Sequence, residues 1–225
     1  MAARMTPSLQ ITWLGHSAVK IQGSRTVIID PFLSGNPKAA HGPEAIADAD
    51  VVIVTHHHSD HLGDAFAIAK KTGAVIVAIH EIAVEAQAGG LSAVGMNIGG
   101  TVEANGVTVH MVNAVHSAEK GNPAGVVIEM DGKRIYHAGD TALTYDMKLV
   151  GEYFHPDLSL LPIGDCYTMG PASAAKAVEF IRTKKVVPIH YGTFPAVCGD
   201  PEKFKRLVGT KAKVIILKPG ETTRL

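Results

Sequence analysis

Residues 51–61 read VVIVTHHHSDH, an apolar run that leads directly into four potential metal ligands within six residues. A short, continuous apolar run is typical of a strand that is covered on both faces. Side chains i and i+2 of an extended chain point the same way, so His56 and His58 can reach one point in space. Asp60 and His61 come where the chain turns into a helix and can converge on a neighbouring point. The segment therefore predicts a metal site at the end of a buried strand rather than a solvated polar loop.

Three later residues occupy similar positions. His116, Asp140 and His190 each follow a predicted strand, at the edge where α/β folds build sites from several loops. Taken singly, each would be read as a cap or an ordinary surface group. Taken together with the first segment, they form a candidate ligand set of imidazoles and carboxylates.

The composition indicates a globular protein of one domain, because 225 residues with 46% hydrophobic and 19% charged side chains can bury a sizeable core. Twenty-one basic residues balance 21 acidic ones, which argues against a nucleic-acid or anionic-membrane partner. Two cysteines, Cys166 and Cys198, suit a reducing cytosol and are expected to be small buried residues. The opening stretch MAARMTPSLQ has no signal-peptide pattern and no apolar run approaches a membrane span, so we expect a cytoplasmic protein.

Strand and helix patterns alternate along the chain in two similar halves, roughly 1–115 and 116–225. We expect strands at 10–15, 18–22, 26–30, 51–55, 74–79, 125–130, 134–138, 158–162, 186–190 and 214–217, and helices at 63–71, 81–88, 142–152, 171–182 and 201–208. This order predicts an α/β fold of two mixed sheets packed face to face with helices outside, in a single domain spanning 1–225.

The ligand set, in its order along the chain, resembles the metallo-β-lactamase superfamily of binuclear hydrolases. The strings WLGH at 13–16, IIDPF at 28–32, YHAGDT at 136–141 and PIHYG at 188–192 are similar to one branch of it. That branch holds ascorbate-6-phosphate lactonase and metal-dependent hydrolases without an assigned substrate. The resemblance runs from Ile11 to the last predicted strand, and it implies a four-layer αββα sandwich.

The resemblance also implies how the ligands divide. One ion would be held by His56, His58 and His116, a second by Asp60, His61 and His190, and Asp140 would bridge both. The implied cofactors are two divalent ions, zinc first, with manganese, nickel, iron or cobalt as alternatives. Family members usually carry a small residue where His57 stands; strand alternation aims His57 away from the ions, towards packing or a backbone contact.

On this reading the catalytic residues are Asp60 and Asp140. Two ions would lower the pKa of a shared water, and the resulting hydroxide would attack the substrate. Asp60 would orient the hydroxide and pass a proton to the leaving group. Asp30 is either an acceptor that holds a ligand histidine or simply a turn residue before proline. Weaker candidates for substrate or supporting contacts are His16, His137, Asn122, Asp165 and Tyr191.

Three functions compete. The first is hydrolysis of a small lactone or ester, the second is a phosphodiesterase acting on a small molecule, and the third is a non-catalytic metal-binding protein. The first two share a small-molecule substrate, and no serine nucleophile elbow or phosphate-binding glycine loop is present in the sequence. The sequence leaves undecided whether the protein forms a homo-oligomer, because it contains no recognisable apolar interface pattern.

Overall fold

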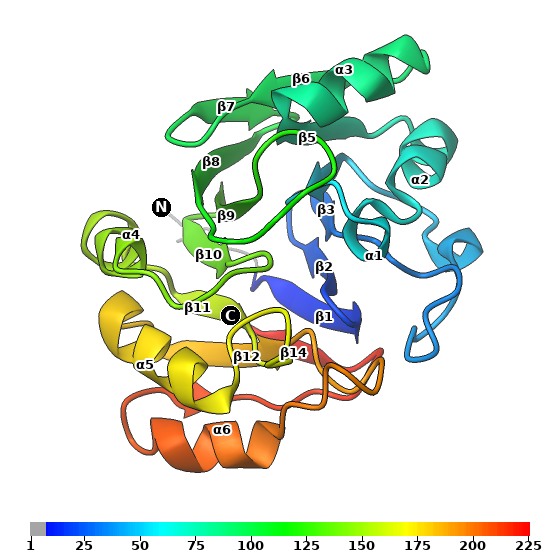
Figure 1. Cartoon of the computed structure of the whole chain (residues 1–225). Helices are drawn as coiled ribbons and strands as arrows, with labels where there is room; N and C mark the ends of the chain where they lie inside the picture. Colours follow the sequence, from blue (N-terminus) through cyan, green and yellow to red (C-terminus); the bar gives the residue numbers. More distant parts are fainter. Residues whose placement is uncertain (1–7) are drawn as a thin grey trace, which may run out of the picture.

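The computed structural model describes residues 8–225, so most of the stretch used above to judge a signal peptide lies outside it. Two seven-stranded sheets pack face to face, and both are mixed (Figure 1). The first sheet has the order β14-β1-β2-β3-β4-β5-β6 and the second has the order β13-β12-β11-β10-β9-β8-β7. In each sheet antiparallel strands on one side continue into parallel strands on the other.

The strands of the first sheet are β1 (Gln10–Gly15), β2 (Ala18–Gln22), β3 (Thr26–Ile29), β4 (Val51–Val54), β5 (Val75–Ile79), β6 (Ala93–Met96) and β14 (Thr222–Arg224). Those of the second are β7 (Thr101–Ala104), β8 (Val107–Asn113), β9 (Ala124–Met130), β10 (Lys133–His137), β11 (Leu158–Pro162), β12 (Lys185–Ile189) and β13 (Lys213–Val214). The helices are α1 (Ser59–Leu62), α2 (Ala65–Thr72), α3 (His80–Ala88), α4 (Asp146–Phe154), α5 (Pro171–Ile181) and α6 (Pro201–Val208), with a 3-10 turn η1 at Pro43–Ala45. None of the helices between residues 8 and 225 has the length and apolar character needed to cross a membrane.

Alternation along the strands builds two hydrophobic layers. Val126 and Ile128 of β9 and Leu160 of β11 face the core between the sheets, whereas Val127 and Leu161 belong to the layer under α4, α5 and α6. Strands buried on both faces explain why their sequences are continuous apolar runs. The sandwich expected from the sequence is confirmed, with helices on its outer faces (Figure 1).

Several helix and sheet boundaries in the structure differ from those expected from the sequence. The change of sheet falls between β6 and β7 rather than near residue 115, and β14 returns to pair with β1 of the first sheet. The helix expected over 142–152 begins later, at Asp146, whose N–H donates to the Thr144 hydroxyl in the turn just before the helix (3.0 Å). The helix expected at 63–71 is preceded by one further turn, α1, and Gly63 with φ +41° separates the two. The cysteine prediction is wrong, since Cys166 and Cys198 are both exposed.

Gly151 is a test of how tightly α4 packs on α5. A Cβ at Gly151 would lie 2.3 Å from the carbonyl oxygen of Ile181, a backbone atom that cannot rotate away. We expect Gly151→Ala to lower the free energy of unfolding by about 1–3 kcal/mol, measured by urea denaturation. The control is Gly89→Ala, where φ is −79° and the nearest atom would be 3.3 Å away. Equal stability of the two variants would contradict the packing described here.

Candidate metal centre

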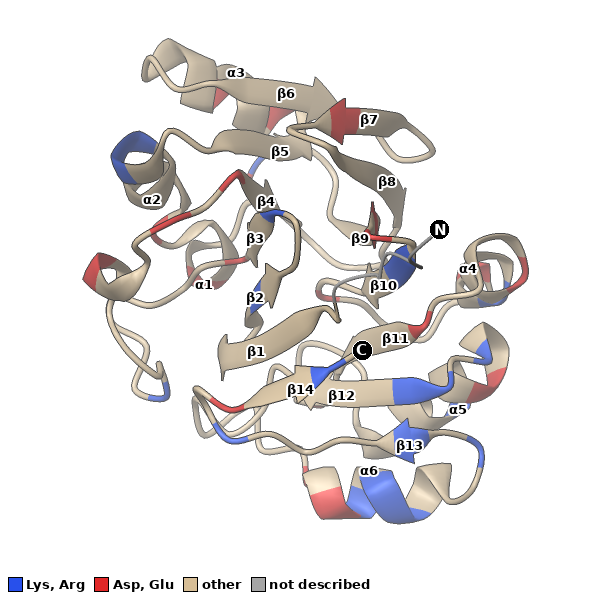
Figure 2. Ribbon diagram, turned by 180° about the vertical axis from the view of Figure 1, so that it is seen from behind, with Lys and Arg blue, Asp and Glu red and all other residues tan. Residues whose placement is uncertain are grey.

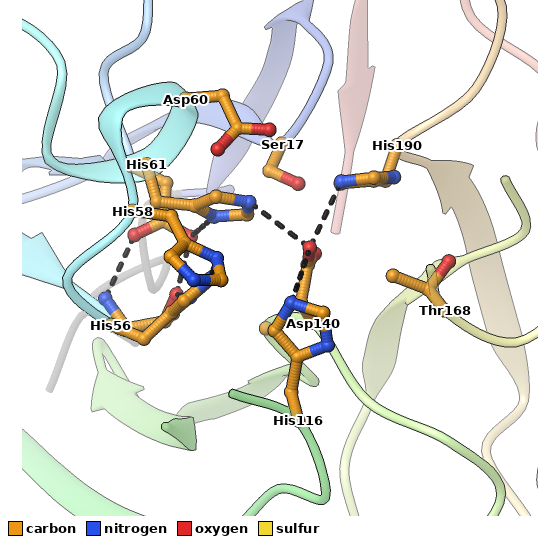
Figure 3. A network of polar contacts seen from close by, with 12 residues as sticks. Ser17, His56, His58, Asp60, His61, His116, Asp140, Thr168 and His190 are labelled. Atoms are coloured by element: carbon orange, nitrogen blue, oxygen red, sulfur yellow. Dashed lines mark hydrogen bonds and ion pairs between the residues drawn. The ribbon is translucent and has the colours of Figure 1, made fainter. Parts of the chain in front are cut away.

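All seven predicted ligand residues meet at one edge of the sandwich (Figure 3). Four of them follow β4, and the others follow β8, β10 and β12. The ligand atoms of His56, His58 and His116, which we call the first group, lie within 4.8 Å of one another. Those of Asp60, His61 and His190, the second group, do the same. The side chains thus gather from both sheets; His16 joins the second group, and a third set of His56, His61 and Asp140 overlaps both groups.

Asp140 connects the two groups. Its Oδ2 atom lies 3.3 Å from His61 Nε2, 3.0 Å from His190 Nε2 and 3.6 Å from His116 Nε2. Burial pushes the pKa of Asp140 upwards, but His61 and His190 outweigh burial and hold this pKa well below its usual value. An ionised oxygen shared among histidines of both groups is suited to bridge two cations.

In the first group, His56 directs an unprotonated ring nitrogen at His58. The Thr55 hydroxyl donates to Asp30 Oδ2 (2.7 Å), so it accepts the hydrogen bond from His56 Nδ1–H (3.0 Å). This leaves His56 Nε2 unprotonated in the neutral ring, 3.0 Å from His58 Nδ1. Burial, aided by His61, lowers the pKa of His56 to about 2, so the ring is neutral and available as a ligand.

Asp30 orients His61, a member of the second group, from the side of the ring opposite Asp140. Its buried carboxylate accepts the Thr55 N–H (2.8 Å) at Oδ1 and His61 Nδ1–H (2.8 Å) at Oδ2. The bond fixes His61 with Nε2 directed at Asp140. Burial lowers the pKa of His61, but the carboxylates of Asp140 and Asp30 outweigh it and raise this pKa well above its usual value. Asp30 also has φ +45°, so it serves both as the turn residue and as the supporting acceptor.

Several polar atoms at the centre have no hydrogen-bond partner among the described residues. They are buried and comprise Asp140 Oδ1 and His190 Nδ1, while His61 Nε2 and His190 Nε2 lie near Asp140 Oδ2 (3.3 and 3.0 Å) without the geometry of a hydrogen bond. A buried polar atom without a partner costs about 1–3 kcal/mol. Cations between the two groups would satisfy these atoms, and nitrogen and carboxylate donors suit divalent transition ions. The residues therefore fit a metal centre.

Two further histidines support the cluster. His16 contacts Asp60 Oδ2 through Nε2 (3.1 Å) and Thr193 Oγ1 through Nδ1 (2.9 Å), and burial lowers its pKa to about 4. His137 Nδ1 accepts the Gly139 N–H (3.1 Å), so its Nε2–H donates to the Ser17 carbonyl oxygen (3.0 Å). His137 therefore shapes the turn that presents Asp140.

The other weak candidates lie elsewhere. Tyr191 stacks on Trp13 with ring centroids 5.2 Å apart, and burial raises the pKa of its hydroxyl to about 12. Asn122 is exposed, and the Asp165 N–H donates to the Met169 carbonyl oxygen (3.1 Å). None of the three candidates lines the cavity described below.

His57 points away from the cluster, as strand alternation predicts. Its carbonyl oxygen accepts the Glu119 N–H (3.1 Å), which is a backbone contact of the expected kind. Its ring also lies between two carboxylates, with Nε2 3.3 Å from Glu85 and Nδ1 3.4 Å from Glu119. His57 thereby links the ligand segment to α3 and to the loop that carries His116.

A cavity of about 320 Å³ opens onto the cluster. It is lined by His58, Asp60, His116, Ser117, Asp140, Tyr167, His190, Phe194 and Val197. Sequence reasoning missed Ser117 and the wall formed by Tyr167, Phe194 and Val197. Ser117 and Tyr167 lie in loops, 117–124 and 164–171, that the sequence indicates as shaping the pocket, but no periodic pattern gives the course of these loops or singles out Phe194 and Val197.

A two-sheet sandwich with His and Asp ligands at a shared edge defines the metallo-β-lactamase class of metal-dependent hydrolases. The family model described as a Beta-lactamase superfamily domain matches residues 25–191. A UPF0173 metal-dependent hydrolase of Thermococcus onnurineus is 53% identical over 226 residues, covering 96% of this chain and all of that protein. The chain therefore belongs to the UPF0173 metal-dependent hydrolases of the metallo-β-lactamase superfamily.

Solved structures agree with this assignment. Igni18, a metallo hydrolase from the archaeon Ignicoccus hospitalis, is 40% identical, has a TM-score of 0.92 and aligns over 97% of this chain and 98% of its own. An isothiocyanate hydrolase from Delia radicum gut bacteria aligns over 95% of this chain and 98% of its own, with a TM-score of 0.75 at 20% identity. At that identity the likeness shows the fold alone.

Asp30→Asn tests the support behind His61. The new amide would place an N–H either against His61 Nδ1–H or, in the opposite orientation, against the Thr55 backbone N–H, so a buried donor is left unpaired. We expect the free energy of unfolding to fall by about 3 kcal/mol and metal affinity to fall about 10–100-fold. Urea denaturation and titration with a fluorescent chelator measure the two effects. Exposed Asp48 is the control, and Asp48→Asn should change stability by less than about 0.5 kcal/mol.

The buried neutral histidines predict a pH dependence for the metal-free protein. His16 and His56 have folded pKa values of about 4 and about 2, below the ordinary 6.5. Below pH 6.5 the unfolded chain therefore binds protons that the folded protein does not, and stability falls by about 1.4 kcal/mol per pH unit for each group. His61, with its raised pKa, is protonated in both states there and adds no slope.

The measurement is the urea midpoint of the metal-free protein near pH 6.5 and near pH 5, with a lower midpoint expected at the acid value. Replacing exposed His155 with Asn should leave the slope unchanged, whereas His16→Asn should reduce it. Equal midpoints at the two pH values would show that these rings are not neutral in the folded protein.

Proposed function

We propose that this hydrolase cleaves a small, uncharged ester or lactone, using two divalent ions held by the first and second groups with Asp140 between them. The observation that carries the proposal is the cavity, whose walls combine the ligand cluster with an apolar side. Its volume of about 320 Å³ is at the small end of ligand sites, which suits a small molecule rather than a polymer.

The ions, when bound, would polarise the scissile carbonyl and lower the pKa of the attacking water. The protein's own contribution centres on Asp60, which lines the cavity and whose side chain is 31% exposed. Its Oδ2 atom accepts a hydrogen bond from His16, which leaves Oδ1 free of any partner among the described residues. That oxygen is available to an ion, to water or to substrate.

The charge state of Asp60 leaves it able to accept a proton. Burial raises its pKa, but the hydrogen bond from His16 and the nearby His61 outweigh burial and hold this pKa below its usual value. Asp60 is therefore ionised at neutral pH and can accept a proton from the attacking water. The same carboxylic acid can then donate that proton to the leaving alkoxide.

The cavity wall favours an uncharged substrate over a phosphodiester. No Lys or Arg is among its lining residues, and Asp60 and Asp140 add negative charge. Proteins that bind phosphate commonly supply Arg or Lys side chains for it. Figure 2 shows Lys and Arg on α6 and β13, which do not line the cavity. Tyr167, Phe194 and Val197 instead offer apolar contact to an acyl or alkyl group.

A substrate panel on metal-reconstituted protein tests this proposal. We expect turnover of γ- and δ-lactones or short aryl esters, with kcat/KM at least about 100-fold above that for bis-p-nitrophenyl phosphate. Asp140→Asn should abolish turnover and reduce bound metal, because the shared oxygen would lose its charge. Asp48→Asn is the control.

Two results would decide against the proposal. A preference for the phosphodiester would transfer the assignment to a small-molecule phosphodiesterase. Full metal loading without turnover of any compound in the panel would favour a non-catalytic metal-binding protein.

A further inference from the structure

We propose that His16 is a positioning residue that holds Asp60 in its reactive orientation, and that Thr193 holds the His16 ring for this role through a hydrogen bond to Nδ1. The three side chains form a hydrogen-bonded relay running from Thr193 through His16 to Asp60. The proposal rests on the proposed function only where it assigns proton transfer to Asp60.

The geometry fixes the direction of the relay. The buried Thr193 hydroxyl lies 2.9 Å from His16 Nδ1, and His16 Nε2 lies 3.1 Å from Asp60 Oδ2. An ionised carboxylate only accepts hydrogen bonds, so Nε2 must carry the proton. In the neutral ring Nδ1 is then an acceptor, and the Thr193 hydroxyl is the donor that it requires.

The His16 ring is held by its backbone as well. His16 is fully buried with φ +55°, and its carbonyl oxygen accepts the His190 N–H (2.9 Å) and the Trp13 Nε1–H (2.8 Å). Its ring centroid lies 4.0 Å from that of His190. His16, the middle member of the relay, is therefore held where a backbone hydrogen bond joins the ends of β1 and β12.

Asp60 needs such a support more than the other ligands do. It sits on α1, a helix of four residues, and its carboxylate is partly exposed to the cavity. His56 and His61, by contrast, are fully buried and are held by Thr55 and Asp30 respectively. Without the bond from His16, the Asp60 carboxylate would be free to rotate, and proton transfer depends steeply on such alignment.

A competing role for His16 is that of an additional metal ligand, since its ligand atom lies within 4.8 Å of those of the second group. Both of its ring nitrogens already have hydrogen-bond partners, however, whereas His190 Nδ1 is buried without one and His190 Nε2 faces only Asp140 Oδ2, at 3.0 Å. The contacts thus favour positioning over coordination, and metal content separates the two roles.

The first test reads the tautomer in the metal-free protein, where activity plays no part. Long-range ¹H–¹⁵N spectra of the His16 ring should show the Nε2–H form in the wild type and in Thr193→Ser. In Thr193→Val the acceptor Nδ1 loses its donor, so its ¹⁵N resonance should move downfield, while the Nε2–H form persists because Asp60 still accepts that proton. An unchanged Nδ1 resonance in Thr193→Val would overturn the part assigned to Thr193.

The second test uses two replacements that each keep one side of the ring. His16→Gln keeps an N–H near the position of Nε2, whereas His16→Asn keeps a polar group only near Nδ1. We expect His16→Asn to lower kcat about 10–100-fold with KM changed less than about 2-fold and with metal content unchanged. His16→Gln should recover most of the lost kcat. Adding Thr193→Val to His16→Asn should cost nothing further, because the relay is already broken.

The outcomes separate the two proposals. Loss of bound metal in folded His16→Asn would assign His16 as a ligand and overturn the positioning role. Equal kcat in the Gln and Asn variants would show that the bond to Asp60 does not matter. If the wild type hydrolyses none of the offered substrates, the proposed function fails, while the tautomer experiment still decides whether Thr193 and Asp60 set the state of His16.

Discussion

The structure depends on the convergence of imidazole nitrogens and an ionised carboxylate on one small volume. Asp140 Oδ2 meets histidines that arrive from both sheets, and the nitrogens of His56 and His58 face each other at 3.0 Å. Such groups are expensive to bury without a positive charge between them. Hydrogen bonds to the outer ring nitrogens hold the ligands in place: Asp30 holds His61 and Thr55 holds His56. Fold and centre are therefore linked, since the sandwich must close before the ligands can meet.

Much of this centre could be predicted from the sequence because its signals are local. Strand alternation places His56 and His58 on one side and turns His57 to the other, where the structure finds it beside Glu85. The positions of His116, Asp140 and His190 follow from a rule about strand ends. Their meeting at one edge does not follow from that rule, and only the resemblance implied it.

The parts that the sequence could not supply depend on contacts between distant segments. The bond from His16 to Asp60 joins β1 to α1, and that from His16 to Thr193 joins residues 177 positions apart. Phe194 and Tyr167 reach the cavity through loops whose course no periodicity describes. The exposed cysteines illustrate the same limit, because a residue's average tendency to be buried says little about one position in a loop.

The short strand β14 has a consequence for how this protein is made. It closes the first sheet by pairing with β1, and the hydroxyl groups of Thr12 and Thr222 meet at 2.8 Å although 210 residues separate them. Contacts of such high sequence separation form late and slowly. Before Thr222 has been synthesised, one edge of β1, just upstream of His16, has no paired strand. The strand that leads into the metal centre at His16 therefore has a paired neighbour on both edges only after residues 222–224 have joined the sheet.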